Sequence, residues 1–203
     1  MKKFILVIIT LLLSDLALAC SPARPSAERL NDIRPTIITS PNKQFFLKLV
    51  PSRWKKKSAV IKRIKDSYAI AFEVLPDGQF KQLWSFKFWD NRETHSWFSK
   101  VKRPDFYLSD DGMNLVEINA VQHNNDKSAV VMYKKGKKVK RYAPMDFGIN
   151  KLKVGPTSCR FKSWIMYSEN RRANDRATEV NIRTVDNVLW HIDPDSLKFR
   201  KAQ

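Results

Sequence analysis

Short runs of alternating apolar and polar residues, separated by turn residues, extend along most of the chain from Ile37 onward. This alternation is typical of an antiparallel sheet protein, because successive side chains of a strand point to opposite faces. The clearest turn is the Asp-Gly pair at 77–78, since Asp-Gly between two alternating runs strongly favours a hairpin. The pattern predicts strands over residues 45–50, 68–75, 80–88, 106–108, 115–118, 129–133, 139–142, 164–167, 178–184 and 188–192.

The order of strands and turns repeats along the chain. A Ser-Pro-Asn-Lys turn at 40–43 begins the first unit, and a Ser-Asp-Asp-Gly turn at 109–112 begins the second. The Asp-Asn pair at 186–187 marks a third, looser unit. A single meander cannot bury its apolar face alone, so we expect the units to pack together. The predicted fold is mainly β, with antiparallel meanders in two to three repeat-like units, as a small sandwich or propeller-like sheet with little helix.

Two segments depart from the strand pattern. Residues 54–65 carry Val60, Ile61 and Ile64 among lysine and arginine, which fits a short amphipathic helix or a loop. Residues 144–149 begin with proline, which suits the first turn of a helix, so we expect one helical turn there.

The first twenty residues have the form of an export signal. Lys2 and Lys3 precede a short apolar run at 4–13, and Ala17 and Ala19 supply the small residues of a cleavage site. The run is too short for a permanent transmembrane helix, and no second run of sufficient length follows. We therefore expect a signal peptide at 1–19, a proline-rich arm at 20–36 and a single β-rich domain at 37–203, located in the periplasm or outside the cell.

The two cysteines, Cys20 and Cys159, have two interpretations. An even number of cysteines in an exported protein favours a disulfide. A bridge here would close a loop of about 140 residues and contribute roughly 4–5 kcal/mol through chain entropy. Because Cys20 directly follows the expected cleavage site, it could instead be acylated and anchor the protein to a membrane. Both interpretations stay open, and a free thiol is the remaining one.

The net charge of +18 at pH 7 favours association with anionic polymers or surfaces. The cations gather in two places, which would merge into one positive face if the units stack in a similar orientation. The simpler explanation is that lysine solvates exposed hairpins and protects sheet edges from aggregation. The candidate residues for an anionic ligand are Lys55, Lys56, Lys57, Lys134, Lys135, Lys137, Lys138, Lys140 and Arg141.

Local patterns for catalysis or metal binding are weak. The three histidines are isolated in sequence, and no serine lies in a Gly-x-Ser-x-Gly motif. Asp110 with Asp111, and Asp193 with Asp195, could be read as carboxylate pairs, but both lie in turn sequences where aspartate bonds its own backbone. We expect no cofactor and no metal.

Several motifs combine a turn with a strand. They are Ile-Thr-Ser-Pro-Asn at 38–42, Leu-Trp-Ser at 83–85, Tyr-Leu-Ser-Asp-Asp-Gly at 107–112, Met-Tyr-Lys-Lys-Gly at 132–136, Arg-Thr-Val-Asp at 183–186 and Trp-His-Ile-Asp at 190–193. These motifs resemble a family of bacterial exported β-rich proteins with repeated Ser-x-Asp-Gly turns and no assigned activity. The chain departs from the family pattern at Asn187 and at Lys43, where the family prefers glycine, and at Ile192, where it has Phe. The resemblance implies a compact β domain of the bacterial envelope and transfers no catalytic residue.

From these observations we predict an exported envelope or secreted protein that binds an anionic surface, an anionic polymer or a protein partner without catalysis. Nucleic acid is a less favoured partner, for which Trp54 and Tyr142 could stack on bases. Trp89, Trp97 and Phe98 could instead form a carbohydrate-binding surface. Two further alternatives are a hydrolase with a site assembled from separate loops and a structural accessory protein of the envelope.

Overall fold

The computed structural model describes residues 31, 34–57, 60–88, 105–119, 121–123, 128–149, 161–165 and 179–202. Antiparallel strands make up most of these residues, and the 3-10 turn η1 (Pro144–Phe147) lies at the predicted helical turn. The predicted mainly β fold with little helix is therefore confirmed. The described residues contain no helix long and apolar enough to cross a membrane.

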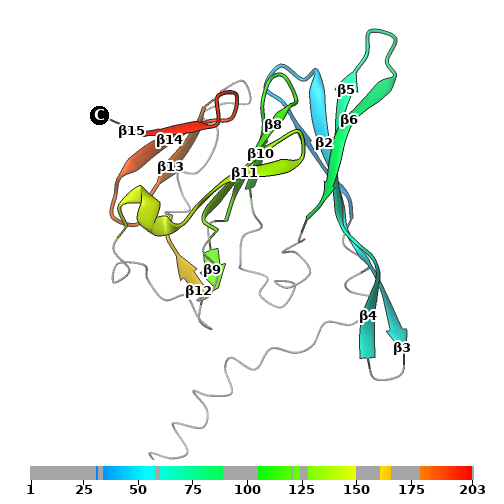
Figure 1. Ribbon diagram of the computed structural model, residues 1–203, viewed down its shortest axis with the longest axis horizontal. Coiled ribbons are helices and arrows are strands. Elements are labelled where there is room, and N and C mark those ends of the chain that lie inside the picture. Colours follow the sequence, from blue (N-terminus) through cyan, green and yellow to red (C-terminus); the bar gives the residue numbers. More distant parts are fainter. Residues whose placement is uncertain are drawn as a thin grey trace, which may run out of the picture.

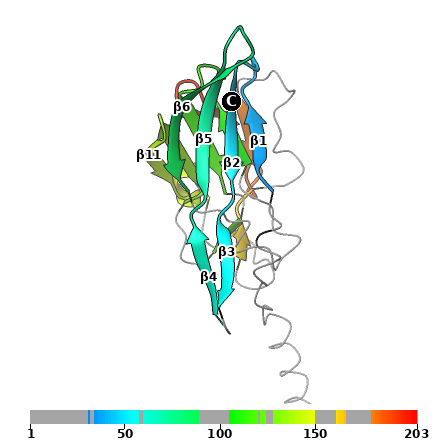
Figure 2. The ribbon, with the colours of Figure 1, turned by 90° about the vertical axis from the view of Figure 1, so that its right-hand side faces the viewer.

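The first sheet is a four-stranded meander with the strand order β1-β2-β5-β6. Its strands are β1 (Thr36–Thr39), β2 (Phe45–Val50), β5 (Tyr68–Val74) and β6 (Phe80–Lys87). A separate hairpin, β3 (Arg53–Lys57) with β4 (Val60–Lys65), continues β2 and β5 beyond the end of this sheet (Figure 2).

The prediction of a helix or loop at 54–65 is wrong, because these residues belong to the β3–β4 hairpin. Val60, Ile61 and Ile64 have a spacing that also fits a helix, but in the hairpin Ile61 is half-buried while Val60 and Ile64 are exposed. The backbone of Trp54 is held by the side chain of Asn31, which accepts from its N–H and donates to its carbonyl, both at 2.9 Å. The extended backbone of β2 and β5 thus continues into the hairpin.

The second sheet is also a four-stranded meander, and the third has three strands. The second has the order β11-β10-β8-β7, formed by β7 (Asp105–Leu108), β8 (Asn114–Ile118), β10 (Val130–Lys134) and β11 (Lys137–Tyr142). The third has the order β13-β14-β15, formed by β13 (Val180–Arg183), β14 (Leu189–Asp193) and β15 (Lys198–Lys201). Figure 1 shows the three sheets arranged in chain order across the molecule.

The third unit differs most from its prediction. Residues 164–167 were expected to form a strand, but the described part contributes only a bridge between Ile165 and Thr184. The neighbouring strand β12 (Phe161–Ser163) pairs with β9 (Val121–His123) and not with the third sheet. The final strand, β15, was not predicted.

Two apolar cores hold the sheets together, and β10 contributes to both. Val131 and Tyr133 pack into the first core, between the first two sheets, whereas Val130 and Met132 pack into the second core, toward the third sheet. This division follows from the alternation of side chains along one strand. β8 and β10 of the second sheet are therefore buried on both faces and form the centre of the fold, whereas β11 at its edge is exposed.

Three turns repeat the same local structure. In each of them a hydroxyl donates to the side-chain oxygen two residues later, in the pairs Ser40–Asn42, Ser109–Asp111 and Thr184–Asp186. The backbone then becomes left-handed, with φ of 62° at Lys43, 68° at Gly112 and 65° at Asn187. The repeated bonds confirm the three repeat-like units, and the turns at Lys43 and Asn187 form without glycine.

The turns of successive units also bond to one another. Asn42 donates its backbone N–H to Asp110 Oδ1 at 2.9 Å, and the N–H of Asp110 donates to Asp195 Oδ1 at 2.7 Å. Burial raises the pKa of Asp195, and the negative charges of neighbouring aspartates add to this effect. The hydrogen bond from the N–H of Asp110 acts in the opposite direction and lowers the pKa. The aspartates that resembled catalytic pairs thus join the ends of the sheets, as their turn sequences indicated.

Several predictions concern residues outside the described ranges. They are the signal peptide at 1–19, Cys20, Cys159, Trp89, Trp97 and Phe98.

Candidate functional site

The β3–β4 hairpin is a strongly cationic ribbon. Seven of the eleven residues in its two strands are lysine or arginine, and residues 53–65 contain no aspartate or glutamate. We call these two strands the cationic ribbon. In Figure 1 the ribbon extends away from the three sheets, at the lower right of the view.

The strand register of the cationic ribbon places like charges opposite each other. Lys55 lies opposite Lys62, and Arg53 lies opposite Lys65. Such pairs destabilise a hairpin because the side chains of directly opposed residues are close. Lys57 and Val60 form the next opposed pair on the face that carries Lys55 and Lys62. All six residues of these three pairs are exposed. One face of the ribbon therefore presents three ammonium groups beside an apolar side chain.

The other face of the cationic ribbon is more compact. Trp54 lies opposite Arg63, whose guanidinium carbon is 4.8 Å from the centre of the indole ring. This distance allows a cation–π interaction, which fixes both side chains against the ribbon. Trp54 is therefore engaged within the protein rather than presented as a free stacking surface.

The second basic cluster lies on β10 and β11, and a β-bulge decides which way its cations point. Strict alternation would put residues three apart on opposite faces. The register shifts at Val139, however, so that Lys138 lies opposite Tyr133 and Arg141 lies opposite Val131. Both partners face the first core. The bulge thus brings Lys138 and Arg141 to the same side of the second sheet.

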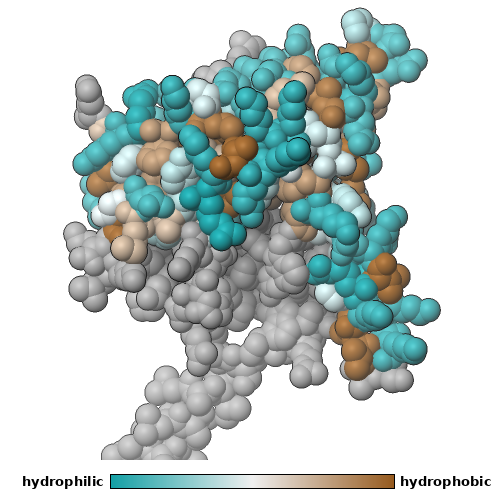
Figure 3. All heavy atoms as spheres, viewed as in Figure 1, coloured by the Kyte–Doolittle hydropathy of each residue, from teal (hydrophilic) through white to brown (hydrophobic). Residues whose placement is uncertain are grey.

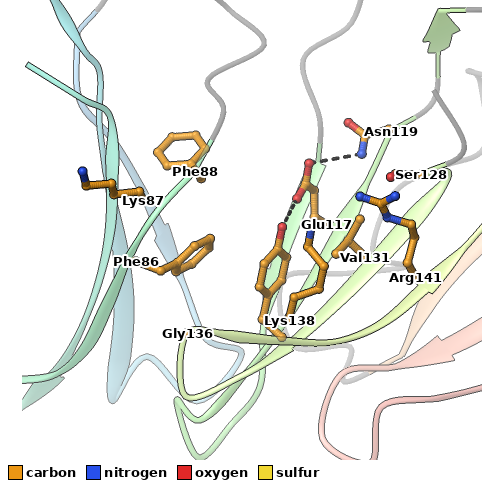
Figure 4. A pocket seen from close by; sticks show the side chains of 11 residues that line it. Phe86, Lys87, Phe88, Glu117, Asn119, Ser128, Val131, Gly136, Lys138 and Arg141 are labelled. Atoms are coloured by element: carbon orange, nitrogen blue, oxygen red, sulfur yellow. Dashed lines mark hydrogen bonds between the residues drawn. The ribbon is translucent and has the colours of Figure 1, made fainter. Parts of the chain in front are cut away.

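A cleft of about 430 Å³ lies on that side, between β6 of the first sheet and the second sheet. Phe86 and Phe88 lie on one side, and Glu117 lies on the other side with Arg141 beside it (Figure 4). Tyr133 also lines the cleft, with its ring stacked on Phe86. The remaining lining residues are Lys87, Asn119, Ser128, Val131, Gly136 and Lys138.

A hydrogen-bonded carboxylate occupies the polar wall of the cleft. Tyr133 Oη donates to Glu117 Oε2 at 2.7 Å, and Asn119 Nδ2 donates to Oε1 at 3.1 Å (Figure 4). Burial, together with the negative charge of Glu117 and its hydrogen bond, raises the pKa of Tyr133 far above its usual value. The phenol therefore remains protonated and holds the carboxylate in place.

Three cations line the cleft, and they come from two different sheets. Lys87 pairs with Asp66 at 2.7 Å, and this hydrogen bond with the charge of Asp66 raises the pKa of the lysine. Lys138 and Arg141 come from the opposite sheet. The cleft therefore combines aromatic side chains, a hydrogen-bonded carboxylate and cations from two sheets.

The structure distributes the sequence-predicted cations over separate elements. Lys55, Lys56 and Lys57 lie on β3, and Lys134, Lys135, Lys137, Lys138, Lys140 and Arg141 lie on the β10–β11 hairpin, all of them exposed. Figure 3 shows hydrophilic side chains over both hairpins on one face of the molecule. Only Lys138 and Arg141 of this set line the cleft, so the predicted cations that reach it all belong to the second cluster.

Tyr142 does not have the exposed position expected for stacking on a base. Its ring packs edge-on against Phe199, with the centroids 4.7 Å apart, and also against Phe147 at 6.2 Å. Tyr142 therefore belongs to the packing around the second core.

Sequence reasoning missed the polar wall of the cleft, formed by Glu117, Asn119 and Tyr133. The available signal was a single acidic residue, Glu117, within a strand whose other positions are buried. Phe86 both stacks on Tyr133, with a centroid distance of 4.7 Å, and lines the cleft.

The described residues contain no group of three or more histidine, cysteine or acidic side chains that could hold a metal ion. Comparisons with protein-family models, curated proteins and solved structures found no match to this chain.

Proposed function

We propose that this protein is an exported, non-catalytic binding protein for an anionic polymer or surface of the bacterial envelope. The observation that carries the proposal is the cationic ribbon, in which exposed lysines face one another across two strands without an acidic residue in the segment. The high positive charge of the whole chain supports it, because such a charge steers anionic partners toward the protein.

The energetic cost of the ribbon supports a role in binding. Each pair of like charges directly opposite one another weakens a hairpin by roughly 0.2–1 kcal/mol. The pairs Lys55–Lys62 and Arg53–Lys65 both incur this cost. A polyanion would relieve the repulsion and release its own counterions, so the same arrangement favours a strongly salt-dependent complex.

Retention on immobilised heparin tests this proposal. The triple variant Lys55→Gln, Lys57→Gln, Lys62→Gln removes three charges from one face of the ribbon. We expect it to elute at a clearly lower salt concentration than the unmodified protein, because fewer counterions are released on binding. A matched control, Lys48→Gln, Lys198→Gln, Lys201→Gln, removes three exposed charges from β2 and β15.

The control should elute close to the unmodified protein. Equal shifts for the two triple variants would show that net charge alone causes retention, and the ribbon would lose its assigned role. Circular dichroism of each variant checks that the fold is intact.

A second candidate function is binding of an acidic sugar unit in the cleft. The observation that favours it is the aromatic wall of Phe86 and Phe88 facing Glu117, with Arg141 at the rim. Adding the variant Lys138→Gln, Arg141→Gln to the heparin series separates the two sites. If the cleft binds heparin, this variant will elute at a lower salt concentration than the unmodified protein. Unchanged retention would confine binding to the ribbon.

The hydrolase alternative stays a prediction. It requires a concave pocket with convergent polar groups, and the cleft has that form. Among its lining residues, Glu117 is the single acidic side chain, so these residues do not supply the carboxylate pair that glycoside hydrolysis commonly uses.

A further inference from the structure

Two exposed apolar side chains lie within the cationic ribbon. Val60 is 66% exposed and Ile64 is 62% exposed. Lys57 lies opposite Val60 across the hairpin, and Ile64 lies between Arg63 and Lys65 in the sequence. Neither Val60 nor Ile64 packs into one of the two cores. Figure 3 shows hydrophobic areas among hydrophilic side chains at the lower right of the molecule, where the ribbon lies.

We propose that the cationic ribbon docks on the surface of an anionic phospholipid bilayer. The inference rests on the proposed function and names its ligand class. A dissolved polyanion needs only charge, whereas a bilayer interface offers anionic headgroups next to a less polar layer. The ribbon matches both parts of that interface, since it combines ammonium groups with exposed aliphatic side chains.

The strand register places both kinds of side chain on a single face. Val60 shares its face with Lys55, Lys57 and Lys62, because alternate residues and directly opposed residues of a hairpin point the same way. Long lysine stems can lie along an apolar layer while their ammonium groups stay at the level of the phosphates. This face can therefore place Val60 below the headgroups while the three lysines bind them.

The position of the ribbon favours contact with a flat surface. β3 and β4 continue beyond the ends of β2 and β5, so the ribbon projects from the first sheet (Figure 2). On the opposite face, the contact of Trp54 with Arg63 and the bonds from Asn31 to the Trp54 backbone support the ribbon. The docking face is thus presented on a structured support.

Cosedimentation of the full chain with vesicles tests the inference. The vesicles are equimolar phosphatidylglycerol and phosphatidylcholine, compared with phosphatidylcholine alone. The variant Val60→Ser, Ile64→Ser removes the apolar contribution and keeps every charge. We expect about a tenfold weaker affinity for the anionic vesicles, since burial of two aliphatic side chains is lost, with heparin retention unchanged.

The matched control is Ile37→Ser, Val139→Ser, which makes the same two exchanges at exposed positions of β1 and β11. It should bind anionic vesicles like the unmodified protein. The lysine triple variant should lose both vesicle binding and heparin retention.

Full vesicle affinity of the Val60→Ser, Ile64→Ser variant would overturn the inference, as would retention on heparin without binding to anionic vesicles. In the second case the proposed polyanion binding would stand. Loss of heparin retention in the control triple to the same extent as in the ribbon triple would instead remove the role of the ribbon in the proposed function.

Discussion

At the scale of single residues, Gly112 shows why one turn keeps its glycine while two related turns do not. Its φ of 68° lies in the left-handed region, like those of Lys43 and Asn187. A β-carbon at Gly112, however, would lie 2.5 Å from Cδ1 of Phe45. Lys43 and Asn187 show that residues other than glycine can adopt the left-handed φ of this turn position. At residue 112, however, the side chain of Phe45 leaves no room for a β-carbon.

The variant Gly112→Ala should therefore destabilise the protein by more than backbone strain alone. We expect a loss of roughly 2–4 kcal/mol, combining left-handed strain with overpacking against Phe45. Gly78→Ala is the matched control, because Gly78 has φ of 79° and no atom within 4 Å of the added β-carbon. It should cost roughly 1–2 kcal/mol. Urea unfolding measures both, and equal losses would contradict the role of the Phe45 contact.

At the scale of elements, the sequence predicts strands well where a buried face imposes alternation. β2, β5 and β8 agree with their predictions to within one residue, because each contributes alternate side chains to a core and has a recognisable turn at one end. The cationic ribbon was missed because it lies outside both cores, so no buried face imposes a clear period of two on its sequence.

The candidate sites show the same limit. The cations of the cleft could be selected from composition, but their shared direction depends on the bulge at Val139, which no local sequence signal indicated. Glu117 and Phe86 come from different sheets, so their approach depends on how those sheets pack. Sequence periodicity describes one strand at a time and carries little information about such contacts.

The link between Asn31 and the cationic ribbon gives an element-scale prediction. Asn31→Ala removes the acceptor for the Trp54 N–H and the donor to its carbonyl, so we expect faster hydrogen exchange of the Trp54 amide. Asn31→Asp keeps the acceptor and should preserve most of the protection of this amide. Hydrogen exchange monitored by NMR measures the protection of the Trp54 amide in both variants. Unchanged exchange in Asn31→Ala would show that this side chain does not hold β3.

At the scale of the whole molecule, the second sheet joins the other two into one folding unit. It supplies Leu115 and Val131 to the first core, and Val116 and Met132 to the second core. Hydrogen bonds across sheets reinforce this arrangement, since Trp84 Nε1 of the first sheet donates to the carbonyl of Gly112 at 2.8 Å. Loss of either core exposes one face of the same sheet, so the cores are coupled.

We therefore expect Leu47→Ala in the first core and Ile182→Ala in the second to shift one common unfolding transition. Each side chain is fully buried, so each variant should lose about 2–5 kcal/mol. Tryptophan fluorescence and far-UV circular dichroism in urea should report coincident midpoints. Two separate transitions in either variant would contradict the coupling.

The opposed lysines of the cationic ribbon have a consequence for thermodynamic measurement. Salt screens the repulsion between Lys55 and Lys62 and so relaxes the free ribbon, while it also weakens attraction to an anion. Both effects weaken binding as the salt concentration rises, so they add in the free energy of binding. The salt dependence of affinity will then be steeper than the number of contacting cations implies. A ligand that neutralises the ribbon will in turn raise its resistance to unfolding, so occupancy can be followed by stability alone.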